Sequence, residues 1–142
     1  MALLSPVFFL MVLGIFELGL MLGAQQLLEN AAFRTARLAK TGYTNANMTQ
    51  TQTVNQLLVD ELSSYGSLID PAKVLMTGVA YGSFSKAGAG TGGVAGYGTA
   101  QQIVVYTVSY PWKLFTPMLT GLIGKDGYVT LTSTIVVRNE PY

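Results

Sequence analysis

Carboxylic acids are the side chains of this 142-residue chain best suited to acid–base chemistry, because the chain contains no His and no Cys. Five of them are scattered over predicted helix and turn positions, with no spacing that favours a catalytic pair: Asp60, Glu61, Asp70, Asp126 and Glu140. The missing His and Cys remove the usual ligands of zinc and haem, thiol chemistry and a His general base. Metallo-hydrolases, Ser-His-Asp hydrolases and redox enzymes are thereby excluded, and we expect no catalytic, metal or cofactor site.

Three glycines, Gly88, Gly90 and Gly93, match the G-x-G-x-x-G pattern of dinucleotide-binding sites. That pattern works by opening a helix that holds a pyrophosphate, whereas here the sequence predicts a following strand and no later ribose-binding acid. We therefore predict a flexible connection over residues 86–100. A net charge of +1 provides no basic stripe, so nucleic acid is not an expected partner, and neither is a small-molecule substrate.

Glu17 is the one ionisable residue within a long apolar segment. Only 11% of the chain is charged, and residues 1–28 carry Glu17 alone. The apolar run from Ala2 to Ala24 would span about 34 Å as a helix, enough to cross a hydrocarbon core of about 30 Å. An acid within such a span costs about 2.5–3.5 kcal/mol and usually marks a pairing or functional position. The nearest cations on the same helix lie about 25 Å away, so we expect that Glu17 pairs with another chain or is protonated.

The helix is predicted to continue in water to about Thr41, with Gly42 ending it. Gly19 and Gly23 form a G-x-x-x-G pair on a different face from Gly14 and Glu17, which favours close packing of helices but also fits the general abundance of Gly in membrane helices. The basic residues that follow could bind lipid headgroups or acids of a neighbouring subunit, or could simply be solvated: Arg34, Arg37 and Lys40. Their charge favours a cytoplasmic C-terminal domain.

The chain resembles the TadE-like family of pilin-like membrane proteins from tight-adherence pilus systems. The resemblance lies in Pro6, in residues 14–19 (Gly-Ile-Phe-Glu-Leu-Gly), in Asn30-Ala31-Ala32 and in Ala36-Arg37 with Ala39. Near the C-terminus it extends to residues 108–111, Thr116-Pro117 and residues 137–141. Leu20 stands where the family often has Arg, and the prepilin cleavage signature is missing. A chain that begins late and one whose mature start is Met1 are both compatible with this pattern.

The resemblance implies a structural subunit of a Tad/Flp-type pilus or of its assembly machinery. Such a subunit sits in the bacterial inner membrane with its C-terminal domain outside, before assembly with other pilin-like subunits into a pilus that mediates adhesion. The residues expected to form the helix-packing surface are Glu17, Gly14, Gly19, Gly23, Ala31, Arg34 and Arg37. The alternative function is a monomeric, membrane-anchored module that binds an extracytoplasmic partner.

Residues 43–142 are predicted to form a small domain, which makes the expected fold α+β with a long helix over residues 1–42. Val54 to Tyr65 has helical periodicity and follows a polar loop over residues 43–53. Strand patterns occupy residues 74–84, 103–110 and 128–138, which predicts an antiparallel sheet of about three strands. Thr116-Pro117 predicts a short helix between the last two strands.

Overall fold

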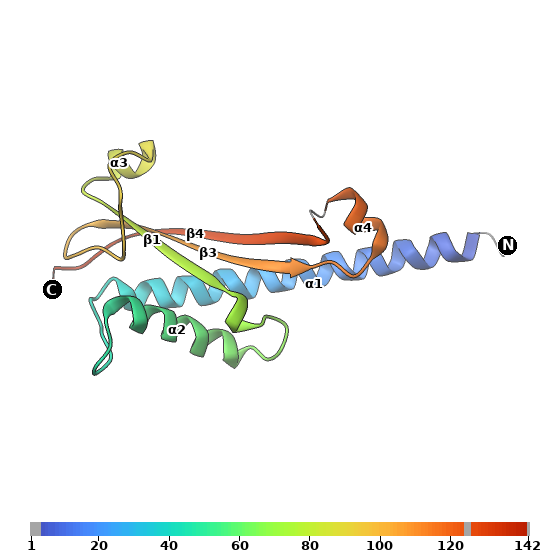
Figure 1. Cartoon of the computed structure of the whole chain (residues 1–142), viewed down its shortest axis with the longest axis horizontal. Helices are drawn as coiled ribbons and strands as arrows, with labels where there is room; N and C mark the ends of the chain where they lie inside the picture. The colour runs from blue at the N-terminus through green and yellow to red at the C-terminus, as the bar shows by residue number, and fades with distance from the viewer. Residues whose placement is uncertain (1–3, 124–125, 142) are drawn as a thin grey trace.

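The computed structural model describes residues 4–123 and 126–141, in which one long helix, α1 (Leu4–Ala39), lies beside a small domain (Figure 1). Residues 1–3 of the predicted helix lie outside the described range. At its other end α1 closes as predicted, because Gly42 takes a left-handed φ of 71° and its amide donates to the carbonyl of Ala39. The predicted α+β class is confirmed.

Helix α2 (Gln50–Ser64) begins earlier than its periodicity predicted, within the stretch expected to be a loop. Thr49 and Gln52 explain the difference by forming a capping box, in which each side chain accepts from the other residue's backbone amide. This arrangement satisfies two amides at the start of the helix, so the polar residues after Thr49 are helical. A short 3₁₀ turn, η1 (Pro71–Lys73), then leads into the sheet.

The sheet has four antiparallel strands in the order β2-β1-β3-β4, one more than predicted. Its strands are β1 (Leu75–Tyr81), β2 (Val94–Ala95), β3 (Ile103–Lys113) and β4 (Tyr128–Arg138). The predicted alternation is confirmed on β3, where Val104, Tyr106, Val108 and Tyr110 are all buried. The central position of β3 explains this burial, because it pairs with β1 on one side and β4 on the other.

The glycine-rich segment is more ordered than the predicted flexible connection. It contains the end of α3 (Phe84–Ala89) and the added strand β2. β2 can approach β1 because Gly93 has no side chain: a Cβ there would lie 2.5 Å from Cγ1 of Val79. Gly90 ends α3 in a left-handed conformation, so this pattern closes a helix instead of opening one for a phosphate.

The outer half of α1 forms the centre of the core. In Figure 1 it runs between α2 and the β3–β4 pair, and it contacts both. A stripe of mostly small residues on α1 is fully buried there: Ala24, Leu28, Ala31, Ala32, Ala36 and Ala39. The small Ala side chains bring α2 and the sheet close to the helix. The domain itself therefore covers this face of the outer half of α1.

Candidate functional site

Glu17 is fully buried, and its partners are two backbone amides of its own chain. Phe115 N donates to Oε1 at 2.7 Å, and Thr116 N donates to Oε2 at 2.8 Å. These amides belong to the connection between β3 and the short helix α4 (Pro117–Leu122). Both carboxylate oxygens are therefore engaged, and hydrogen bonds to a charged acceptor are short and strong. The sequence predicted that Glu17 pairs with another chain or is protonated, but its observed partners are amides of its own chain, so the expectation that a partner must come from another chain is wrong.

Helix α4 begins where it was predicted, at Pro117, but Thr116 does not cap it with its side chain. Instead, the carboxylate of Glu17, about a hundred residues earlier in the sequence, accepts hydrogen bonds from the two amides just before the helix. Leu119 N and Thr120 N both donate to the carbonyl of Thr116, which closes the first turn. The acid on α1 thus fixes the connection from β3 into α4 against the long helix.

Gly14, one turn before Glu17, lies under α4. A Cβ at Gly14 would be 3.4 Å from Cε of Met118 and 3.9 Å from Cγ of Leu119. Gly14 and Glu17 therefore hold α4 together, the first through close contact and the second through hydrogen bonds. Ala31, further along α1, is fully buried in the core of the domain. These three residues have intramolecular contacts, and a role for them between subunits stays a prediction.

Gly19 and Gly23 have open space around them. A Cβ at either position would meet no atom within 4 Å, helix backbone aside. At 3.6 residues per turn the two glycines point about 170° away from Gly14 and Glu17. They belong to a free face of α1 that also presents Val12 and Phe16, both exposed. The structure thus separates the predicted packing residues into a covered set and an exposed set.

The three basic residues beyond the apolar segment differ in their contacts. Arg34 pairs with Glu61 of α2 at 2.9 Å, and Lys40 pairs with Glu140 at 3.1 Å. Arg37 forms no ion pair among residues 4–123 and 126–141, and it is exposed. It lies on the same side of α1 as Gly19 and Gly23. Of the two arginines predicted to bind a neighbour, Arg37 is therefore the one whose charge is available.

Glu61 also accepts a hydrogen bond from the hydroxyl of Tyr65 at 2.7 Å. This hydrogen bond raises the pKa of Tyr65 above its ordinary value, with burial as a smaller cause. Burial alone raises the pKa of Tyr97, whose hydroxyl donates to the carbonyl of Met76. Both groups serve the packing of the domain.

Replacing Arg34 with Gln is expected to lower the free energy of unfolding by less than about 1 kcal/mol, because the Arg34 side chain is 68% exposed and ion pairs of exposed side chains contribute little. Urea unfolding of the full chain in detergent would measure the difference. Lys73→Gln, which removes another exposed pair, with Asp70, is the matched control. A loss of several kcal/mol for Arg34→Gln alone would show that the pair is essential to the packing of α2 on α1.

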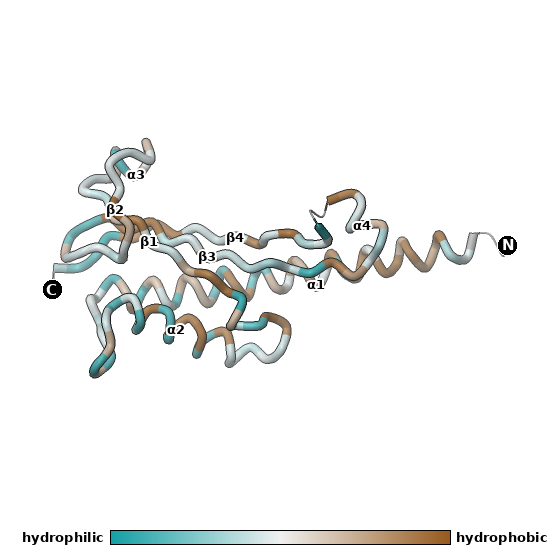
Figure 2. Tube along the Cα trace, viewed as in Figure 1, coloured by the Kyte–Doolittle hydropathy of each residue, from teal (hydrophilic) through white to brown (hydrophobic). Residues whose placement is uncertain are grey.

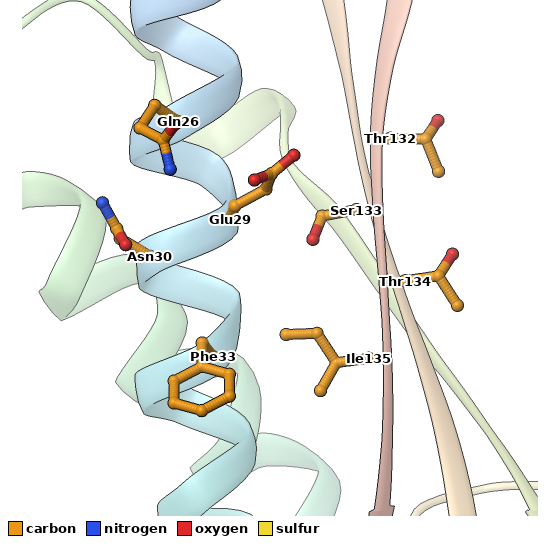
Figure 3. Close-up of a pocket in the computed structure, with 8 residues that line it drawn as sticks. All are labelled: Gln26, Glu29, Asn30, Phe33, Thr132, Ser133, Thr134 and Ile135. Carbon is orange, nitrogen blue, oxygen red and sulfur yellow. The ribbon is translucent and has the colours of Figure 1, made fainter.

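A shallow groove lies between α1 and the outer edge of β4. Figure 3 shows its lining, with Gln26, Glu29, Asn30 and Phe33 from the helix and residues 132–135 from the strand. Beside it Gln25 donates from Nε2 to Oε1 of Glu29 at 2.8 Å and to the carbonyl of Thr132 at 3.0 Å. The groove is thus a polar seam, in which Gln25 ties the edge strand to the helix.

The N-terminal end of α1 extends beyond α4 and the rest of the domain, as Figure 1 shows. Ser5–Ala39 is long and apolar enough to cross a membrane. Large side chains are exposed in every direction over its first part, among them Val7, Phe8, Phe9, Met11 and Leu13. Such a surface is stable in lipid and unfavourable in water. The helix has the properties of a membrane anchor.

The family model described as TadE-like protein matches residues 1–37. The resemblance noted in the sequence is therefore confirmed for the N-terminal segment, which contains Glu17 and the glycines. The match associates the chain with pilin-like proteins of Tad/Flp pilus systems, and the resemblance near the C-terminus stays a prediction. No curated protein and no solved structure matches the chain.

The sequence identified Glu17 as unusual but did not reveal its partners. Nearly every residue has a backbone amide, so the residue type does not show which amides donate to Glu17. The available clue was Thr116-Pro117, since a helix start leaves amides in need of acceptors. The sequence also did not reveal Met118 and Leu119 as the contacts of Gly14. Thr116-Pro117 predicted the short helix that contains both residues, but not the surface of α1 against which it packs.

Proposed function

We propose that this protein is a pilin-like structural subunit of a Tad/Flp-type pilus or its assembly machinery, and that it packs against other subunits through the free face of α1. The observation that carries the proposal is the division of α1 into two faces. One face is covered by the domain through Glu17, Gly14 and Ala31. The opposite face is exposed along the apolar half, around Gly19 and Gly23.

The free face suits contact between helices. Two glycines one turn apart let a second helix backbone approach closely in lipid, where packing and not the hydrophobic effect drives association. Phe16 and Val12, exposed beside them, add apolar contact area. Beyond the apolar stretch, Arg37 could meet an acidic group of the neighbour at the level of the domain. The role is structural and requires no catalytic group.

In the proposed arrangement the subunit is anchored in the inner membrane with its domain outside the cytoplasm. Association with further subunits then transfers the exposed apolar half of α1 from lipid into a bundle of helices. The positive charge of Arg34, Arg37 and Lys40 favours the opposite topology, so the topology needs its own test. Labelling of a Val94→Cys variant in spheroplasts with a membrane-impermeant maleimide provides it, because Val94 is 70% exposed and the chain has no other Cys.

Cysteine crosslinking in the native membrane tests the packing. Gly19→Cys and Gly23→Cys variants of the full chain are expected to form crosslinked species with other pilin-like subunits or with a second copy. Gly14→Cys, under α4, is the matched control and is expected to stay uncrosslinked. If the first two variants remained single chains, the helix would be only an anchor, and the monomeric binding module would become the better interpretation.

A further inference from the structure

A second apolar surface, distinct from the free face of α1, lies on the connection between β3 and β4. It consists of Phe115, Met118, Leu122 and Ile123, which are 42–73% exposed, and is called the apolar tip below. Residues 114–123 contain no charged side chain, and the nearest charged residues in the sequence are Lys113 before them and Lys125 and Asp126 after them. Figure 2 shows hydrophobic stretches in α4 alongside the hydrophobic half of α1.

We propose that the apolar tip is immersed in the lipid bilayer beside α1. The inference rests on the anchoring of α1 in a membrane, which is part of the proposed function, but not on any role in a pilus. The first argument is position. Glu17 binds the amides of Phe115 and Thr116, so the start of α4 must lie at the same depth as Glu17. Glu17 itself lies inside the apolar run that ends at Ala24.

The depth follows from the rise along α1. Glu17 lies about 10 Å below Ala24 at about 1.5 Å per residue. Because Glu17 binds Phe115 N and Thr116 N, the start of α4 also lies about 10 Å below the end of the apolar run. This is close to the depth at which interfacial segments insert.

The second argument is the state of the backbone. Irregular backbone at membrane depth is tolerated only where its polar groups have partners within the protein. The two amides that precede α4 have such partners in the oxygens of Glu17, at 2.7 and 2.8 Å. Proline at the first helical position removes a further amide. The acid in the apolar helix thus satisfies two amides of the connection that would otherwise be costly in lipid.

The third argument is the distribution of polar residues around the tip. Lys113, the exposed last residue of β3, precedes Phe115 by two residues, which span at most about 7 Å, and lies on the side toward the domain. A cation at that level can extend to anionic headgroups while the tip lies below them. On β4 three exposed threonine side chains lie successively further from the tip, on the side expected to face water. They are Thr130, Thr132 and Thr134.

Single-cysteine variants of the full chain test the proposal directly, because the natural chain has no Cys. Leu122→Cys, with Met118→Cys as a second tip position, would carry an environment-sensitive NBD dye in vesicles of phosphatidylcholine and phosphatidylglycerol. Ile15→Cys on α1 is the lipid control, and Val94→Cys at the other end of the sheet is the water control. Each emission is measured with brominated phosphatidylcholine and with aqueous iodide as quenchers.

The expected result is a blue-shifted emission at both tip positions, loss of fluorescence with brominated lipid comparable to that at Ile15, and protection from iodide. The Val94 dye should show the reverse. Iodide quenching of the tip while Ile15 responds to brominated lipid would place the tip in water and overturn the inference, leaving the anchor intact. Protection of the tip from both quenchers would assign it to a protein contact and also overturn it. An Ile15 dye insensitive to brominated lipid would refute the anchoring of α1 itself.

Discussion

Replacing Glu17 with Gln is expected to lower the free energy of unfolding of the domain by about 2–3 kcal/mol, although the side chain keeps its size. The carboxylate accepts one amide on each oxygen, from Phe115 and Thr116. A Gln side chain has only one acceptor oxygen. Its NH₂ group would face the second backbone amide, and because both groups are donors they cannot form a hydrogen bond. Glu17→Ala removes both acceptors and leaves a cavity as well, so a loss of about 3–5 kcal/mol is expected.

Urea unfolding of the full chain in detergent micelles would measure both changes. Trp112, the only Trp of the chain, is buried on β3 close to the affected connection and reports on it by fluorescence. Glu29→Gln is the matched control, because Glu29 is exposed and accepts from the Gln25 side chain and not from a backbone amide among the described residues. Since exposed acids contribute little, its effect should stay below about 0.5 kcal/mol. Equal stability of the Glu17→Gln and parent chains would contradict the assigned role of the carboxylate.

The elements of this fold could be predicted where a short stretch of sequence determines them. The alternation of Val104, Tyr106 and Val108 identified a buried strand, and Gly42 identified the end of α1. The added strand β2 could not be predicted in this way. It is only two residues long, and its pairing depends on the missing side chain of Gly93 next to Val79, which is a tertiary contact. Local composition there indicated flexibility alone.

The candidate site shows the same limit. An acid in an apolar helix stood out in the sequence, but its partners lie about a hundred residues away and belong to the backbone. Charge pairing therefore suggested a cation on another chain, which the structure makes unnecessary. The sequence placed Gly14 on a different face from Gly19 and Gly23 but assigned all three to subunit packing, whereas in the structure Gly14 is covered by Met118 and Gly19 is open. Only the fold distinguishes contacts within the chain from surface that remains for a neighbour.

The difference between the open glycines and the covered glycine of α1 leads to a second prediction with a large effect. Gly19→Leu and Gly23→Leu together are expected to reduce subunit association at least about tenfold, equivalent to about 1.4 kcal/mol, since a bulky side chain prevents close approach of helices. The domain should keep its stability, because a Cβ at either position meets no atom within 4 Å. Gly14→Leu is expected to do the opposite: it displaces α4 through Met118 and lowers stability in the isolated chain.

Two measurements on the same variants separate the effects: co-purification of other pilin-like subunits from the native membrane, and urea unfolding in detergent. Gly88→Leu, at an open position on α3, controls for added bulk elsewhere and should change neither. If the Gly19/Gly23 variant unfolded more easily, the face would be needed within the chain. Normal association combined with normal stability would instead show that the free face of α1 meets only lipid, and the proposed packing would fail while the anchoring and the role of Glu17 would stand.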